Sequence, residues 1–128
     1  MIFVDANFII ALASNIDQWH ERAVELLPEA KNEKRVISEL IVSEIITLIG
    51  SLHGGKAAVN IYNYIKDNHL IYKNDELFDE IMLDFLKYDG TLSFADSSAI
   101  TIMKKLKIHK ILSFDSDFDK INNIVRIY

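Results

Sequence analysis

The sequence predicts an α/β fold: one domain with a five-stranded parallel sheet and helices on both faces. Short apolar runs alternate along the whole chain with longer segments of helical periodicity, as expected for strands joined by helical crossovers. The first run, Ile2-Phe3-Val4, contains no polar residue and is typical of a strand buried on both faces at the centre of such a sheet. This run ends at Asp5, and a later apolar run ends in the same way at Asp115.

Length and composition agree with this class. A chain of 128 residues fits a single domain, 1–128, and is long enough to bury a sizeable core. Half of the residues are apolar, with only four glycines and one proline, which indicates an ordered globular protein. There is no cysteine, so disulfides and thiolate metal sites are excluded. The net charge of −5 argues against broad non-specific nucleic-acid binding, although a local basic surface is compatible with it.

The chain shows no sign of a membrane or secretion signal. Because the first strand is expected to start at Met1 or Ile2, we expect no signal peptide before it. No apolar run is long enough to cross a bilayer. We therefore expect a cytoplasmic location.

The first half of the chain is expected to contain three strands, at 2–4, 35–38 and 70–72. Asn7 is a suitable N-cap for a short helix after the first strand, and Asp17 for a helix that Pro28 ends or kinks. Ser38 is expected to cap an apolar helix over 39–49 that closes at Gly50, and a further helix is expected over 56–68.

The second half is expected to contain two helices and the last two strands, 110–113 and 124–128. Asn74 is the expected N-cap of the first helix, with Gly90 as its stop, and Ser93 is the expected N-cap of the second. Helical spacing places apolar side chains inward: Leu77, Phe78, Ile81, Phe85 and Leu86, then Ala95, Ala99, Ile102, Met103 and Leu106.

Two of the predicted strands end in aspartate. Asp5 follows the first strand and Asp115 the fourth, with Asp117 two residues further on. If these strands are neighbours, both acids lie at the carboxyl edge of the sheet, where open α/β folds bind ligands. The alternative is that each acid is only a turn residue.

Asp96 and Glu44 lie on predicted helices. Asp96 follows Ser93 at the spacing of a capping box, and that structural role would by itself explain it. Around its helix, Glu44 has Leu40, Ile41 and Leu48 among its four nearest neighbours, which predicts a charge flanked by apolar side chains. Such a charge is costly unless it is paired or metal-bound. The alternative is a helix-edge side chain that reaches outward to water.

The residue types favour a hard cation over other chemistry. Oxygen ligands select Mg²⁺ or Mn²⁺, and the four histidines are too scattered for a histidine metal motif. Neither Ser93 nor Ser113 belongs to a serine–histidine–aspartate arrangement, and Gly54-Gly55 lacks the lysine of a phosphate loop. Trp19 and the tyrosines are expected to be packing residues. The basic cluster Lys104, Lys105, Lys107 and Lys110 is either a solvated face or a phosphate contact.

Four segments in this order resemble the motifs of PIN domains, and most of all those of small VapC-type ribonucleases. They are Val4-Asp5-Ala6-Asn7, Ile41-Val42-Ser43-Glu44-Ile45, Leu92-Ser93-Phe94-Ala95-Asp96 and Ser113-Phe114-Asp115-Ser116-Asp117-Phe118. The resemblance covers essentially the whole chain and implies a sheet of order 3-2-1-4-5. It also implies an endoribonuclease dependent on Mg²⁺ or Mn²⁺, which leaves 5′-phosphate and 3′-hydroxyl ends.

The resemblance also assigns roles to particular residues. It places the catalytic, metal-binding acids at Asp5, Glu44, Asp96 and Asp115, and a further metal-binding acid, variable in the family, at Asp117. It places polar residues near the site at Asn7 and Ser93.

The resemblance further implies partners. Single-stranded or structured RNA is the expected substrate, homodimers are frequent in the family, and toxin members pair with a small antitoxin. The segments 39–49 and 56–68 are the candidate dimer contacts.

The sequence patterns also allow other interpretations. A phosphatase of the haloacid dehalogenase type would have a second aspartate where this chain has Asn7, and a phospho-receiver needs an acidic pair for which the N-terminus leaves no room. A stand-alone PIN nuclease in RNA processing would share the acids of a toxin. A binding-only PIN module would normally have lost one of the four acids, and all four are present.

Overall fold

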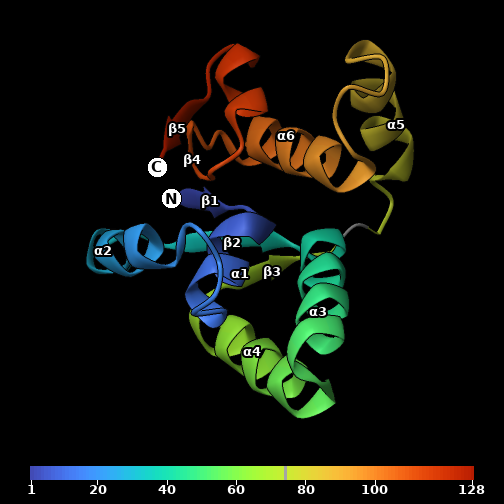
Figure 1. Cartoon of the computed structure of the whole chain (residues 1–128). Helices are drawn as coiled ribbons and strands as arrows, with labels where there is room; N and C mark the ends of the chain where they lie inside the picture. The colour runs from blue at the N-terminus through green and yellow to red at the C-terminus, as the bar shows by residue number, and fades with distance from the viewer. Residues whose placement is uncertain (74) are drawn as a thin grey trace.

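The structure is a computed structural model that describes residues 1–73 and 75–128 (Figure 1). The predicted N-cap Asn74 lies outside the described residues. The elements in chain order are β1 (Ile2–Val4), α1 (Ala6–Ala13), α2 (His20–Ala30), β2 (Arg35–Ser38), α3 (Glu39–His53), α4 (Gly55–Asn68), β3 (Leu70–Tyr72), α5 (Phe78–Lys87), α6 (Phe94–Leu106), β4 (Lys110–Leu112), the 3₁₀ helix η1 (Ser116–Lys120) and β5 (Val125–Ile127).

The five strands form one parallel sheet of order β3-β2-β1-β4-β5, as predicted. β1 is its central strand and is buried along its whole length, which explains its unbroken apolar sequence. The register pairs Val4 of β1 with Leu112 of β4, so these two strands end side by side. The residues that follow them, Asp5 and Ser113, therefore emerge at the same edge of the sheet.

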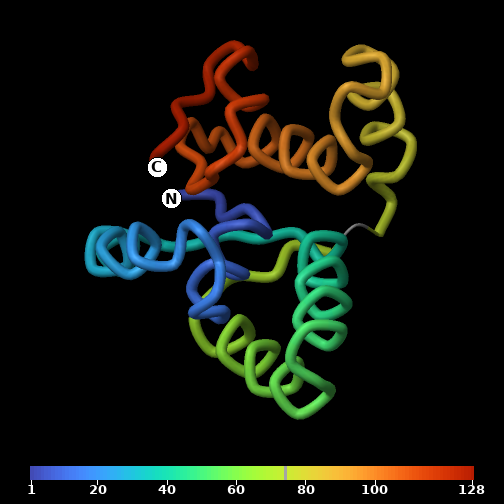
Figure 2. Tube along the Cα trace, viewed as in Figure 1, coloured from blue at the N-terminus to red at the C-terminus, as the bar shows by residue number. Residues whose placement is uncertain are grey.

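Helices cover both faces of the sheet. Figure 1 shows α5 and α6 on one side and α1 and α4 on the other. The chain trace in Figure 2 shows α3 and α4 as a hairpin of neighbouring helices that extends away from the sheet. The core between these layers is formed by large aliphatic and aromatic side chains without solvent exposure, among them Phe3, Ile9, Ile45, Ile100 and Phe118.

Two predicted helix ends are wrong. The N-cap of α1 is Asp5 and not Asn7, because the Asp5 carboxylate accepts a hydrogen bond from the backbone N–H of Ala6. The helix α3 continues through Gly50 to His53 and ends at Gly54, whose φ of +92° suits glycine. A Cβ at Gly50 would lie 3.7 Å from the Cβ of Ala58 in α4, which is an ordinary van der Waals distance, so helix packing does not require glycine at this position.

Helices α2 and α5 begin later than predicted. The Asp17 carboxylate accepts a hydrogen bond from the Trp19 N–H in a turn, and α2 starts only at His20. Pro28 lies in the last turn of α2, which ends two residues later. In α5 the helix starts at Phe78, and both Phe78 and Leu86 are exposed where an inward position was predicted.

The two C-terminal strands are shorter than predicted. β4 ends at Leu112 and β5 spans Val125–Ile127, and the link between them contains η1, which sequence patterns did not predict. Among the described residues no helix has the length and apolar character needed to cross a membrane.

Candidate functional site

Asp5 is the most deeply buried acid at the carboxyl edge of the sheet. The residue is only 3% exposed although its side chain is a carboxylic acid. One carboxylate oxygen accepts from the Ala6 N–H at 2.8 Å, and the other accepts from the Ser113 hydroxyl at 2.6 Å. The backbone N–H of Asp5 also bonds to the carbonyl of Leu112 at 3.0 Å. Strand pairing and helix capping together fix the position of this carboxylate.

Ser113 connects the ends of β1 and β4. Its hydroxyl donates to Asp5 and accepts from the Asp115 N–H at 3.0 Å and from the Asn7 side-chain amide at 3.3 Å. The amide oxygen of Asn7 in turn accepts from the Phe114 N–H at 3.0 Å. From the sequence, Ser113 was weighed only as a nucleophile, and its positioning role was not predicted. The available signal was its place between an apolar strand and an aspartate.

Asp115 and Asp117 lie at the start of η1. The Asp115 carboxylate caps this 3₁₀ helix by accepting from the Asp117 N–H at 2.9 Å. Both residues are half-buried, and the Asp117 carboxylate lies 3.5 Å from the Lys120 ammonium group. The structure therefore brings Asp115 to the edge that Asp5 occupies, while Asp117 has a cationic neighbour.

Asp96 reaches the same edge from α6. It forms the predicted capping box, because its N–H donates to the Ser93 hydroxyl at 3.0 Å and its carboxylate accepts from the Ser93 N–H at 3.4 Å. Burial raises the pKa of the Asp96 carboxyl, and the negative charges of Asp115 and Asp117 raise it further. The capping box thus holds a half-buried carboxylate close to the other acids, and Ser93 positions it.

Glu44 has apolar neighbours, as predicted, but it is exposed. The residue lies on α3 beside Leu40 and Leu48 and reaches outward to water, which was the alternative prediction for it. Partial loss of water raises the pKa of its carboxyl, and the charge of Asp96 raises it further. Glu44 lines an open groove with Leu40, Ser43 and Ala95. It therefore lies at the rim of the acidic edge.

The charges at this edge repel one another. Burial first, and then the charges of Asp96 and Asp115, raise the pKa of the Asp5 carboxyl from 3.8 to about 7. Within the described part of the chain, Asp5, Glu44, Asp96 and Asp115 have no ion pair with a basic side chain. The donor set is made only of oxygen atoms, which suits Mg²⁺ or Mn²⁺.

The acids surround a shared edge without forming a closed ligand cage. Within residues 1–73 and 75–128, no three acidic or histidine side chains stand close enough together to hold an ion as they are oriented. As the side chains are oriented, one or two of these carboxylates would hold a cation with water as its other ligands, and a change of rotamer would bring in the exposed Glu44.

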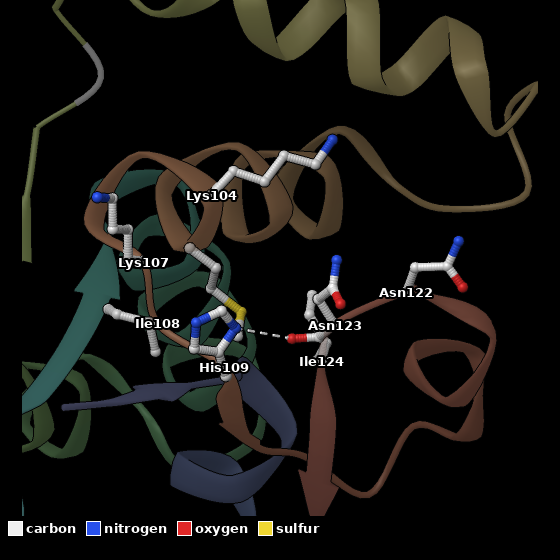
Figure 3. A pocket seen from close by; sticks show the side chains of 8 residues that line it. Lys104, Lys107, Ile108, His109, Asn122, Asn123 and Ile124 are labelled. Carbon is white, nitrogen blue, oxygen red and sulfur yellow. Dashed lines mark hydrogen bonds between the residues drawn. The ribbon is translucent and has the colours of Figure 1, made fainter.

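The opposite edge of the sheet has a different character. A cavity of about 230 Å³ lies there between the end of α6 and the start of β5, and Figure 3 shows Lys107, His109 and Asn123 around it. It contains none of the candidate acids.

Much of the predicted basic cluster is ion-paired, with Lys104 on Asp84, Lys105 on Glu80 and Lys110 on Glu33. These lysines belong to the surface packing of the fold.

Comparison with solved structures finds the same architecture. VapC20 of Mycobacterium tuberculosis, a sarcin–ricin loop cleaving toxin, is 25% identical, with a TM-score of 0.84 and 93% of each chain covered. VapBC2 of Rickettsia felis, bound to a DNA fragment from its promoter, is 14% identical, with a TM-score of 0.69 and coverage of 99% of this chain and 98% of that one. FitAcB of Neisseria gonorrhoeae is 16% identical, with a TM-score of 0.68 and coverage of 100% and 97%.

Among curated proteins, no sequence matches this chain. The family comparison gives a PIN domain over residues 2–124, which is nearly the whole sequence. The sheet order agrees with the one that the sequence motifs implied. The chain belongs to the PIN domain family.

Proposed function

We propose that this protein is a metal-dependent endoribonuclease of the VapC toxin type, which hydrolyses phosphodiester bonds in RNA. The observation that carries the proposal is the buried Asp5 carboxylate, which shares one edge of the sheet with Asp96 and Asp115 and has no cationic partner among the described residues. Acids with perturbed pKa values that converge without an ion-pair partner are typical of functional sites. The likeness to a toxin that cleaves RNA supports the choice of reaction.

The acids at this edge are the proposed holders of Mg²⁺ or Mn²⁺. Asp5, Asp96 and Asp115 would form the inner part of the site, with Glu44 and Asp117 at its rim. A bound divalent ion supplies an activated water and neutralises negative charge on the phosphate. Asp5, whose pKa is raised by burial and then by the charges of Asp96 and Asp115, would gain from such an ion the positive charge that these residues lack.

The remaining residues of the site orient these acids. Ser113 fixes one oxygen of Asp5 and the backbone of Asp115, and Asn7 holds the backbone of Phe114 between them. Ser93 fixes the carboxylate of Asp96. The proposed catalytic groups are therefore held by strand ends and helix caps, which leave little freedom to the inner carboxylates.

The proposed substrate is RNA, and the sarcin–ricin loop is the first RNA to test because the similar toxin cleaves it. A small antitoxin and a homodimer are the proposed protein partners. Exposed apolar side chains on two surfaces could serve them: Leu52 and Val59 on the α3–α4 hairpin, and Leu83 and Leu86 on α5. Sedimentation at tens of micromolar tests the dimer, and a purely monomeric species would contradict it.

The deciding experiment measures cleavage of a short labelled RNA with Mn²⁺, with and without chelator. We expect wild-type cleavage only with the metal, and a loss of about a thousandfold or more in Asp5→Asn, since that residue supplies the central charge of the site. Glu33→Gln is the matched control, because it removes a carboxylate from the opposite edge.

Each outcome has a clear meaning. Cleavage that survives chelation would overturn the metal mechanism. Equal cleavage by wild type and Asp5→Asn would place the activity elsewhere. RNA binding without cleavage under all metal conditions would support the binding-only alternative.

A further inference from the structure

Three aromatic rings lie in a row that leads from the core to the surface, and the outer two of them are stacked. Phe8 is buried in α1, and its ring centroid lies 6.1 Å from that of the half-buried Phe114. Trp19 covers Phe114 from outside, with centroids 4.9 Å apart and ring planes only 5° from parallel. Trp19 is 40% exposed. Stacking on Phe114 therefore leaves a substantial part of Trp19 accessible to solvent.

Hydrogen bonds fix the backbone at both Phe114 and Trp19. Phe114 stands between Ser113 and Asp115, and the Asn7 side chain fixes its backbone N–H. On the other side, the turn before α2 is held by the hydrogen bond from the Trp19 N–H to the Asp17 carboxylate, at 2.8 Å. The indole thus lies on the ring of Phe114, the residue that precedes the proposed metal-binding Asp115.

We infer that Trp19 is a stacking platform for a base of the RNA substrate next to the cleaved phosphate. This inference rests on the proposed function. Every nucleobase presents a flat face that stacks on an aromatic ring, so the contact is strong and tolerant of sequence. In a chain of net charge −5, general attraction for phosphates is weak, and an uncharged contact supplies affinity that lysines do not. Recognition of unpaired bases by aromatic stacking is common in RNA-binding proteins.

A purely structural role for Trp19 predicts something different. If the indole only shields Phe114, its replacement would lower stability without changing the response to RNA. The chain contains a single tryptophan, so intrinsic indole fluorescence reports on this residue alone.

The first test is a binding titration with the full-length Asp5→Asn variant, which is not expected to cleave its ligand. The probe is a dye-labelled oligoribonucleotide of about 12 nucleotides, followed by anisotropy and by Trp19 fluorescence together. We expect quenching that saturates with binding, and little quenching by the same strand with abasic residues. If RNA binds without changing the fluorescence, the stacking role of Trp19 is wrong, whereas the proposed nuclease function stands.

The second test separates substrate binding from catalysis. We expect Trp19→Ala to raise KM by about tenfold to a hundredfold with little change in kcat, and Trp19→Phe to restore most of the affinity. Tyr62→Ala is the control, because Tyr62 is an exposed aromatic residue on α4, a helix that carries none of the candidate acids. Thermal unfolding confirms that each variant is folded.

The outcomes separate this inference from the proposed function. A Trp19→Ala variant with lowered stability but unchanged KM would overturn the platform and support a packing role. Quenching by RNA in a protein whose wild type cleaves none would leave the platform standing and overturn the nuclease. No RNA binding by anisotropy would overturn both.

Discussion

Two acids that contact residues at opposite ends of β4 are in opposite electrostatic states. At the amino end, Glu33 pairs with Lys110 and lies 3.7 Å from the amino group of Met1, and these contacts hold the pKa of its carboxyl below the ordinary value. At the carboxyl end, Asp5 is buried without a cation, and its pKa is raised to about 7. Paired charges serve the fold, whereas unpaired buried charges lower stability and persist where they serve binding or chemistry.

The contrast predicts that a divalent cation binds at the carboxyl edge of the sheet and thereby stabilises the folded protein. Mn²⁺ at a hundredfold excess over its Kd should raise the free energy of unfolding of wild type by about 2.7 kcal/mol through linkage. Thermal unfolding at constant ionic strength measures this. Asp5→Asn should lose most of the gain, and Glu33→Gln should keep it. A melting temperature of wild type that does not respond to millimolar Mn²⁺ would contradict a metal site at the carboxyl edge.

The edges should also respond to pH in opposite directions. The pKa of Asp5 is raised in the folded protein, so its contribution to stability is present at low pH and is lost as the pH rises toward 7. In metal-free wild type this lowers the free energy of unfolding by about 2 kcal/mol between about pH 5.5 and 7.5. Urea unfolding with chelator measures the slope. The same slope in Asp5→Asn would show that another group causes it.

Much of this contrast was visible in the sequence. The buried run Ile2–Val4 followed by Asp5 predicted both a central strand and an acid at its carboxyl end. The Ser93–Asp96 spacing predicted the capping box that the structure contains. These are local patterns, in which neighbouring residues determine the conformation.

Features that depend on distant contacts were not predictable in the same way. The role of Ser113 depends on a hydrogen bond to Asp5, 108 positions away in the sequence. The exposure of Glu44 depends on how α3 packs against α4 and α6, which helical periodicity alone does not show. For the same reason Gly50 was taken as a helix end although α3 continues through it beside Ala58.

Ser113 offers a way to sharpen the contrast without removing a charge. Its hydroxyl lowers the pKa of Asp5, although burial outweighs this effect. Ser113→Ala should therefore raise the pKa of Asp5, so that the loss of stability with rising pH has its midpoint at a higher pH. It should also lower the free energy of unfolding by about 1–2 kcal/mol, since the N–H of Asp115 loses its acceptor. Ser38→Ala removes the buried hydroxyl that bonds to Ser98 and serves as control. A similar midpoint shift in both variants would exclude a specific Ser113–Asp5 effect.

The smallest effect is expected at the amino edge, in Glu33→Gln. The lowered pKa of Glu33 means that its contribution is present above its unfolded pKa of about 4.5 and is lost as the pH falls below it. Because its partner Lys110 is 44% exposed, solvent screening limits the loss to about 0.5 kcal/mol at neutral pH. RNA cleavage should stay within about twofold of wild type, since no proposed site residue contacts Glu33. Urea unfolding at pH about 7 and about 4 measures the pH dependence of the free energy of unfolding, and the cleavage assay measures the activity. A tenfold loss of cleavage in this variant would show that charge at the two edges is coupled, and that the separation of structural from functional acids along β4 is incorrect.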